Sequence, residues 1–205
     1  MMPHSLFESL AAYQKTWFEK WLNPFQEDKK IVERFQTLFL NTDSPFSRDQ
    51  FPGHLTGSCF LLDPSHGKIL LLHHKKLEKW LQMGGHCDGE CEMAQVALRE
   101  AEEESGCKDL SLLSSQIIDL DIHLIPERKN EPEHFHYDVR YLGVCHSPEK
   151  IQLAEEESND LAWFPFEKAF QMAKETSMHR VFRKVEFLQS KGLLSSHRAG
   201  CENLL

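Results

Sequence analysis

The sequence has 205 residues, of which 40% are apolar and 27% are charged, and its net charge is −9. This balance is typical of one folded domain with extensions, and the acidic charge argues against a nucleic-acid surface, because phosphate backbones attract basic patches. No apolar run approaches the ~20 residues of a membrane span, and the first residues lack the basic and apolar regions of a signal peptide. We therefore expect a cytoplasmic protein with no membrane and no nucleic-acid partner.

The first 45 residues are predicted to form a helical extension before the main domain. Ser5 and Glu8 have capping-box spacing, and apolar residues then recur at helical spacing in two stripes separated by Pro24. The stripes contain Leu10, Tyr13, Trp17, Trp21 and Leu22, and then Ile31, Phe35, Leu38 and Phe39. These aromatic faces must be buried against the parent domain, in a homodimer interface or along a substrate site, and the sequence leaves these alternatives open.

The main domain is predicted to span residues 46–192 and to begin with a β-hairpin. Two apolar runs, 56–62 and 68–74, are joined by the turn sequence 63–67, which contains Asp, Pro, Ser and Gly. Residues 43–55 form a polar connector between the helical extension and this hairpin.

A glycine-containing loop and a helix rich in carboxylates follow the hairpin. The loop contains Gly84, Gly85 and Gly89. The helix is predicted over 92–105, because apolar residues recur there at helical spacing, and Gly106 is its stop signal.

Three glutamates of this predicted helix, Glu100, Glu103 and Glu104, lie at positions i, i+3 and i+4 and therefore share one face. Arg99 is the one positive charge between residues 99 and 104. A solvated acidic face is the ordinary interpretation of a Glu-rich helix. The adjacent glycine loop favours a metal site instead, since Mg²⁺ prefers oxygen ligands and can bridge protein to phosphate. We expect Mg²⁺ as the cofactor, with Mn²⁺ as a substitute.

The loop and the helix together resemble the signature of the Nudix hydrolases, Gly-x5-Glu-x7-Arg-Glu-apolar-x-Glu-Glu-x-Gly-apolar. The residues that fit it in register are Gly85, Arg99, Glu100, Ala101, Glu103, Glu104, Gly106 and Cys107. One position departs, because Cys91 stands where the family has its first glutamate, which pairs with the signature arginine. Asp88, Glu90 or Glu92 could reach Arg99 in its place.

This resemblance implies an α/β fold, the Nudix α/β/α sandwich with a mixed β-sheet, and a Mg²⁺-dependent hydrolase that cleaves a diphosphate linkage. The implied substrate is a small nucleoside diphosphate derivative: a nucleotide sugar, a dinucleoside polyphosphate, ADP-ribose or NADH, or a nucleoside triphosphate. The implied catalytic residues are Arg99, Glu100, Glu103 and Glu104. The implied metal ligands are Gly85, Glu100, Glu103 and Glu104, together with Glu157 or its neighbour Glu156 from a later loop.

The roles within this set are partly open at the sequence level. Arg99 is expected to orient Glu100 or to hold the loop, and the general base is either Glu100 or a glutamate of the later loop. The rival interpretation of the whole chain is a non-catalytic Nudix-fold module that binds nucleotides or regulates another process. Such modules would be expected to lose signature carboxylates, and Glu100, Glu103 and Glu104 are all present.

Two further strands are predicted over 116–125 and 137–145, with a charged loop between them. His134, His136, Asp138 and Arg140 alternate along the chain and therefore lie on one face of a strand. This face either meets solvent or faces the signature helix. The patterns His-x-His-x-Asp-x-Arg and Gly-Gly-His-x-Asp-Gly are similar to a bacterial-type Nudix subgroup. The candidate substrate-binding residues are His86, His136, Asp138 and Arg140.

The end of the chain is predicted to contain a strand around 161–164 and helices over 165–175 and 178–191, before a loosely ordered tail at 193–205. Six scattered cysteines are expected to be free thiols in a reducing compartment. Cys87 and Cys91 lie near His86, but no second Cys/His pair follows at zinc-finger spacing, so no structural zinc is expected there.

Overall fold

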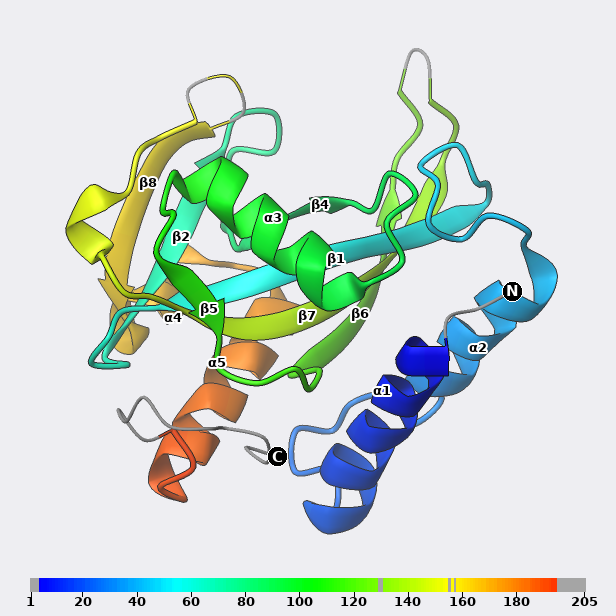
Figure 1. The fold of residues 1–205 in the computed structure, drawn as a ribbon, viewed down its shortest axis with the longest axis horizontal. Helices are drawn as coiled ribbons and strands as arrows, with labels where there is room; N and C mark the ends of the chain where they lie inside the picture. The colour runs from blue at the N-terminus through cyan, green and yellow to red at the C-terminus, as the bar shows by residue number, and fades with distance from the viewer. Residues whose placement is uncertain (1–3, 129–130, 155, 157, 195–205) are drawn as a thin grey trace.

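β1 (Gly53–Leu62) is the strand around which the sheet is assembled (Figure 1). It pairs in parallel with β7 (His134–Cys145) along its whole length. It pairs antiparallel with β4 (Met83–His86) and with the start of β2 (Lys68–His74). The sheet is therefore mixed, as predicted. The structure is a computed structural model that describes residues 4–128, 131–154, 156 and 158–194.

The remaining strands extend the sheet on both sides of β1. β2 pairs with β3 (Lys79–Leu81) and with β8 (Ser158–Pro165). β7 pairs with β5 (Leu110–Leu112) and with β6 (Asp119–Ile125). Every residue of β1 is buried, so the core lies on both faces of this strand.

Helices cover the two faces of the sheet and complete the predicted sandwich. α3 (Met93–Ser105) crosses one face, where Gly57 of β1 meets Val96 (Figure 1). α5 (Thr176–Ser190) covers the other face, where the rings of Phe60 and Phe182 lie 6.3 Å apart. The short α4 (Phe166–Met172) connects β8 to α5.

The N-terminal extension is helical, as predicted, and packs against the domain. It consists of α1 (His4–Gln14), a π-helical turn η1 (Lys15–Lys20) and α2 (Ile31–Asn41). Trp17 and Phe35 are fully buried, and the Phe35 ring contacts Tyr137 of β7 edge-on at 5.3 Å. The aromatic stripes therefore form part of the domain core, whereas the homodimer stays a prediction. Ser5 lies inside α1 rather than capping it, and its hydroxyl donates to Glu92.

Three short strands, β3, β4 and β5, were not predicted. Gly84 and Gly85, assigned from the sequence to a loop, pair with Ser58 and Gly57 and so belong to β4. A strand of three or four residues has too little alternation to be recognised, and glycines are poor strand formers on their own. Pairing with the buried strand β1 imposes the extended conformation here.

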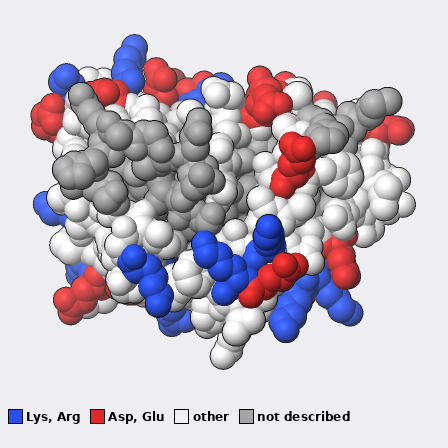
Figure 2. Space-filling model, turned by 60° about the horizontal axis from the view of Figure 1, so that its bottom comes forward, with Lys and Arg blue, Asp and Glu red and all other residues white. Residues whose placement is uncertain are grey.

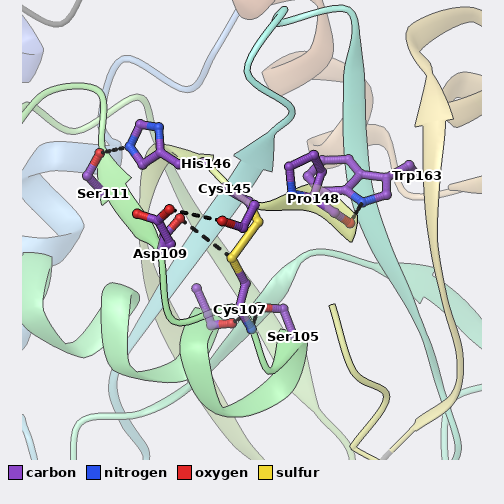
Figure 3. The surroundings of a disulfide bond; sticks show 10 residues. Ser105, Cys107, Asp109, Ser111, Cys145, His146, Pro148 and Trp163 are labelled. Atoms are coloured by element: carbon purple, nitrogen blue, oxygen red, sulfur yellow. Dashed lines mark hydrogen bonds between the residues drawn. A yellow bond between two sulfur atoms is a disulfide. The ribbon is translucent and has the colours of Figure 1, made fainter. Parts of the chain in front are cut away.

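Cys107 and Cys145 form a disulfide, which contradicts the expectation of free thiols for these two residues (Figure 3). The pairing of β5 with β7 sets Leu110 opposite Cys145 and so brings the segment before β5 to the end of β7. The two Cα atoms lie 6.6 Å apart. Cys59, Cys87 and Cys91 are free, and Cys201 lies outside the described residues.

A buried network of charges joins α5 to β6 and to the N-terminal extension. The Lys184 ammonium is fully buried and donates to Glu27, to Asp119 at 2.9 Å and to the Ile118 carbonyl at 2.8 Å. It also lies 4.4 Å from the centroid of the Trp17 ring. A buried charge is tolerated only when it is paired and hydrogen-bonded, so these contacts depend on one another.

Within the residues that the structure describes, no helix has the length and apolar character that a membrane crossing requires. Most of the predicted tail, from residue 195 onward, lies outside these residues. The predicted domain boundaries at 45 and 192 stay predictions.

We predict that Lys184→Met lowers the free energy of unfolding by about 3 to 5 kcal/mol, because the buried Glu27 carboxylate would lose its nearest cation and the buried Asp119 carboxylate one of its three cations. Urea unfolding followed by circular dichroism measures the change. Arg183→Met is the matched control, since Arg183 is the neighbouring residue of the same helix and is exposed. Equal stability of the two variants would contradict this role.

A second prediction concerns the loss of stability in acid. Burial alone would raise the pKa of the Asp121 carboxyl, but the nearby Arg140 guanidinium holds this pKa at about 2. Because an unfolded Asp titrates near about 3.9, this stabilisation of about 2 kcal/mol is present above about pH 4 and is lost as the pH falls toward about 2. Urea unfolding across this range should therefore show a shallower pH dependence for Asp121→Asn than for Asp43→Asn, in which an exposed carboxylate is changed.

Candidate functional site

The candidate site lies where α3 crosses β4. Gly85 stands opposite Gly57 in the pairing of β4 with β1, and both glycines lie beneath α3. A β-carbon at Gly57 would lie 2.8 Å from Val96, and one at Gly85 would lie 2.4 Å from a carboxylate oxygen of Glu100. The close approach of helix and strand therefore requires residues without side chains at these two positions.

The three predicted carboxylates occupy three different environments on α3. The Glu100 side chain is 13% exposed, whereas that of Glu103 is 60% exposed. Glu104 is buried, and its Oε2 accepts a hydrogen bond of 2.7 Å from the backbone N–H of Gly84. The acidic face thus runs from a carboxylate anchored on β4 to one that reaches solvent.

Arg99 connects this acidic face to the end of β4. It donates from Nη1 to Glu100 at 2.6 Å and from Nη2 to the His86 carbonyl at 2.8 Å, and it lies 3.6 Å from Glu103. The same guanidinium therefore orients a carboxylate and holds the strand end in place. At the sequence level these two tasks were alternatives for Arg99.

The three acidic residues proposed to replace the family's first glutamate have other partners in the structure. Asp88 accepts two hydrogen bonds of 2.7 Å from Arg48. Glu90 accepts the backbone N–H of Glu92, and the Glu92 carboxylate accepts the Ser5 hydroxyl. The prediction that one of them reaches Arg99 is wrong, because Asp88 is bound by Arg48 of the connector, Glu90 by the backbone of the turn before α3, and Glu92 by Ser5 of α1.

The donor set at this site consists of carboxylate oxygens from Glu100, Glu103 and Glu104 beside the backbone of Gly85. Hard oxygen donors are the ligands that Mg²⁺ and Mn²⁺ prefer. The residues present therefore fit such an ion. Glu157 lies outside the described residues, and its neighbour Glu156 is exposed.

A family model described as NUDIX domain matches residues 53–185, which is more than half of the chain. The chain belongs to the NUDIX domain family. The matched segment starts at the first residue of β1 and ends within α5, and it includes the whole of β4 and α3. The N-terminal helices precede it. No curated protein matches the sequence.

Solved structures share the Nudix fold at low sequence identity. An Ap4A hydrolase from C. elegans, crystallised as a binary complex, is 19% identical with a TM-score of 0.53, over 67% of this chain and 98% of that one. A MutT protein from Methanosarcina mazei is 16% identical with a TM-score of 0.51, over 67% and 96%. The Nudix hydrolase RenU from M. smegmatis is 15% identical with a TM-score of 0.51, over 71% and 93%.

The polar row on β7 lies on the sheet face opposite the Nudix helix. Gly57 faces α3, so the alternating neighbours Thr56 and Ser58 point away from it. Both hydroxyls donate to Asp138, which therefore shares their face. Of the two alternatives for this row, the one in which it faces the signature helix is wrong, because the register of the sheet assigns the row to the other side.

Two of the candidate substrate-binding residues, Asp138 and Arg140, are buried and hold one another. Arg140 donates to Asp138 at 2.7 Å, to Asp121 at 3.0 Å and to Asp119 at 3.2 Å. Arg180 of α5 also binds Asp119, so this network continues to the helix. In this position Asp138 and Arg140 support the strands behind the candidate site. Their contact with substrate stays a prediction.

The other two candidates, His86 and His136, gather with His54, which the sequence-based prediction placed in the connector. The three ring centroids lie 4.9 to 5.2 Å from one another. Burial lowers the pKa of all three imidazoles, to about 4 for His86 and about 2 for His136. They are therefore neutral near pH 7. The parallel pairing of β1 with β7 would have added His54 to the candidate residues, because this register sets His54 opposite His136.

We predict that Gly85→Ala weakens Mg²⁺ binding at least about tenfold, because the added methyl group displaces the Glu100 carboxylate. Isothermal titration calorimetry with MgCl₂ measures the change. Gly67→Ala is a suitable control, since its nearest contact is a serine hydroxyl at 3.2 Å in a distant turn. Unchanged affinity in Gly85→Ala would mean that Glu100 does not take part in metal binding.

Proposed function

We propose that this chain is a Mg²⁺-dependent Nudix pyrophosphohydrolase that cleaves the diphosphate linkage of a nucleoside diphosphate derivative. The observation that carries the proposal is the packing of the Glu100 carboxylate against Gly85, with Glu103 and Glu104 on the same helical face. This arrangement concentrates oxygen ligands beside two consecutive glycines of β4, Gly84 and Gly85.

The proposed mechanism assigns a task to each of these residues. Glu100, Glu103 and Glu104, with the Gly85 carbonyl, would hold Mg²⁺. The bound ion supplies charge neutralisation on the phosphoryl oxygens and increases the acidity of the attacking water. Arg99 keeps Glu100 aimed at the strand through its 2.6 Å hydrogen bond. The proton of the attacking water is accepted either by Glu100 or by a glutamate of the later loop, Glu156 or Glu157.

The charge of the protein and its family support the proposed substrate class. The chain has a net charge of −9, and on the face in Figure 2 Lys and Arg side chains are interspersed with Asp and Glu side chains. A small anion bound through a metal suits such a protein better than a polyanion. The C. elegans structure is that of an Ap4A hydrolase, which makes a dinucleoside polyphosphate one member of the test panel. Nucleotide sugars, ADP-ribose, NADH and nucleoside triphosphates complete it.

Candidate substrate contacts are proposed beyond the end of β4. His86 directly follows Gly85 on β4, His136 lies on β7 with β1 between the two strands, and both residues are half-buried. Both imidazoles lie on the sheet face opposite α3, so a substrate that contacts them would have to extend past the end of β4. Asp138 and Arg140 would act from behind them through the buried network. The alternative function is a nucleotide-binding module without turnover, and retention of all three signature carboxylates favours the enzyme.

We predict that Glu103→Gln lowers turnover by roughly two orders of magnitude or more, because it removes a carboxylate proposed to bind Mg²⁺. The fold should stay intact, because the Glu103 side chain is the most exposed of the three and supports no buried contact. The assay measures phosphate or nucleotide release from the panel with Mg²⁺, with Mn²⁺ and with chelator. Thermal unfolding verifies the fold.

Glu102→Gln is the matched control, since Glu102 is the adjacent exposed glutamate of α3. Near-normal turnover in Glu103→Gln would refute the metal assignment. Nucleotide binding without turnover of any panel member would favour the binding module.

A further inference from the structure

A cluster of histidines lies on the sheet face opposite α3, outside the carboxylate site. His54, His86 and His136 each place one nitrogen within 4.8 Å of the other two. They come from three adjacent strands, since His54 of β1 stands opposite His136 of β7 and His86 of β4 stands opposite Thr56. Backbone pairing therefore determines where the three imidazoles meet.

A hydrogen bond to a backbone carbonyl determines which nitrogen of His54 carries a lone pair. Its ring is fully buried, and Nδ1 lies 3.1 Å from the Gln50 carbonyl oxygen. A carbonyl only accepts, so Nδ1 carries the hydrogen of the neutral ring and Nε2 carries the lone pair. In the described part of the chain, Nε2 of His54 and Nε2 of His86 are both buried without a hydrogen-bond partner. A buried polar atom of this kind is costly to the fold unless a ligand satisfies it.

A second layer of polar groups supports the cluster, as is usual around metal-binding histidines. Nε2 of His134 lies 3.2 Å from Nε2 of His136, and Nδ1 of His134 lies 2.8 Å from the Pro132 carbonyl. The Glu131 carboxylate lies 3.7 Å from His134 and adds negative charge at the rim. The nearby cation Arg48 is paired with Asp88 through two hydrogen bonds.

We propose that His54, His86 and His136 form a binding site for a first-row transition metal ion such as Zn²⁺. Imidazole nitrogens suit Zn²⁺, whereas Mg²⁺ prefers the oxygen ligands on α3. Ligand atoms around tetrahedral Zn²⁺ lie about 3.3 Å apart, so side-chain rotations that move each nitrogen by about 1 Å would close the present cluster. Three protein ligands leave one coordination position open. Cys87 takes no part, because its thiol lies 3.3 Å from the Leu55 carbonyl on the other face.

The test uses untagged, metal-free full-length protein titrated with ZnCl₂ in excess MgCl₂, which occupies the carboxylate site. We expect one Zn²⁺ per chain, and an affinity loss of about 100-fold or more in His54→Gln and in His136→Gln. His146→Gln is the control, since His146 binds Ser111 at the distant edge strand and is partly exposed. Glu103→Gln should also retain Zn²⁺ binding, which separates this site from the proposed catalytic one.

The proposal is overturned if no stoichiometric Zn²⁺ binds, or if His54→Gln and His136→Gln bind it as the control does. If His54→Gln fails to fold, X-ray absorption spectroscopy at the zinc edge of the Zn²⁺-loaded wild-type protein counts the imidazole ligands instead. Three imidazole ligands in that spectrum would support the site, and fewer would refute it.

Discussion

The close approach of α3 to β1 and β4 is the constraint on which the rest of the site depends. It exists because Gly57 and Gly85 lack side chains beneath the helix, and any β-carbon there would meet Val96 or Glu100. Glu104 and Arg99 then fasten the helix to backbone groups of Gly84 and His86. A helix held this way presents its carboxylates to the strand at short range. A longer distance between the two elements would leave the same carboxylates as a solvated acidic surface.

The buried charge network gives the N-terminal extension its place in the domain. Lys184 is shared between Glu27 of the extension and Asp119 of β6, and the aromatic rings of Trp17 and Tyr13 surround its ammonium group. Arg180 of α5 also lies 3.6 Å from Glu27. Removal of a buried charge from its partners is costly, so these two cations couple the extension to α5. The extension therefore belongs to the same cooperative core as the strands that carry the site.

Strand alternation divides the chemistry of the protein between two faces of one sheet. Gly85 points toward the carboxylates of α3, while its neighbour His86 points toward His54 and His136. The carboxylates of α3 thus lie on one face and the three imidazoles on the other, one residue apart along β4. The two proposed sites differ in the same way, because hard cations prefer oxygen ligands and transition metals accept nitrogen. The Arg99 hydrogen bond to the His86 carbonyl links the two faces.

The sequence by itself determined the family, the helical extension and the carboxylates on α3, and the resemblance to the family implied the mixed α/β architecture. These features depend on local periodicity and on spacing within one segment, which a single chain displays directly. Tertiary structure alone decided that Gly84 and Gly85 form a strand, that Cys107 meets Cys145, and that His54 joins two distant histidines. The physical reason is that strand register is set by pairing between segments far apart in sequence. A shift of one residue in that pairing would move every side chain to the other face.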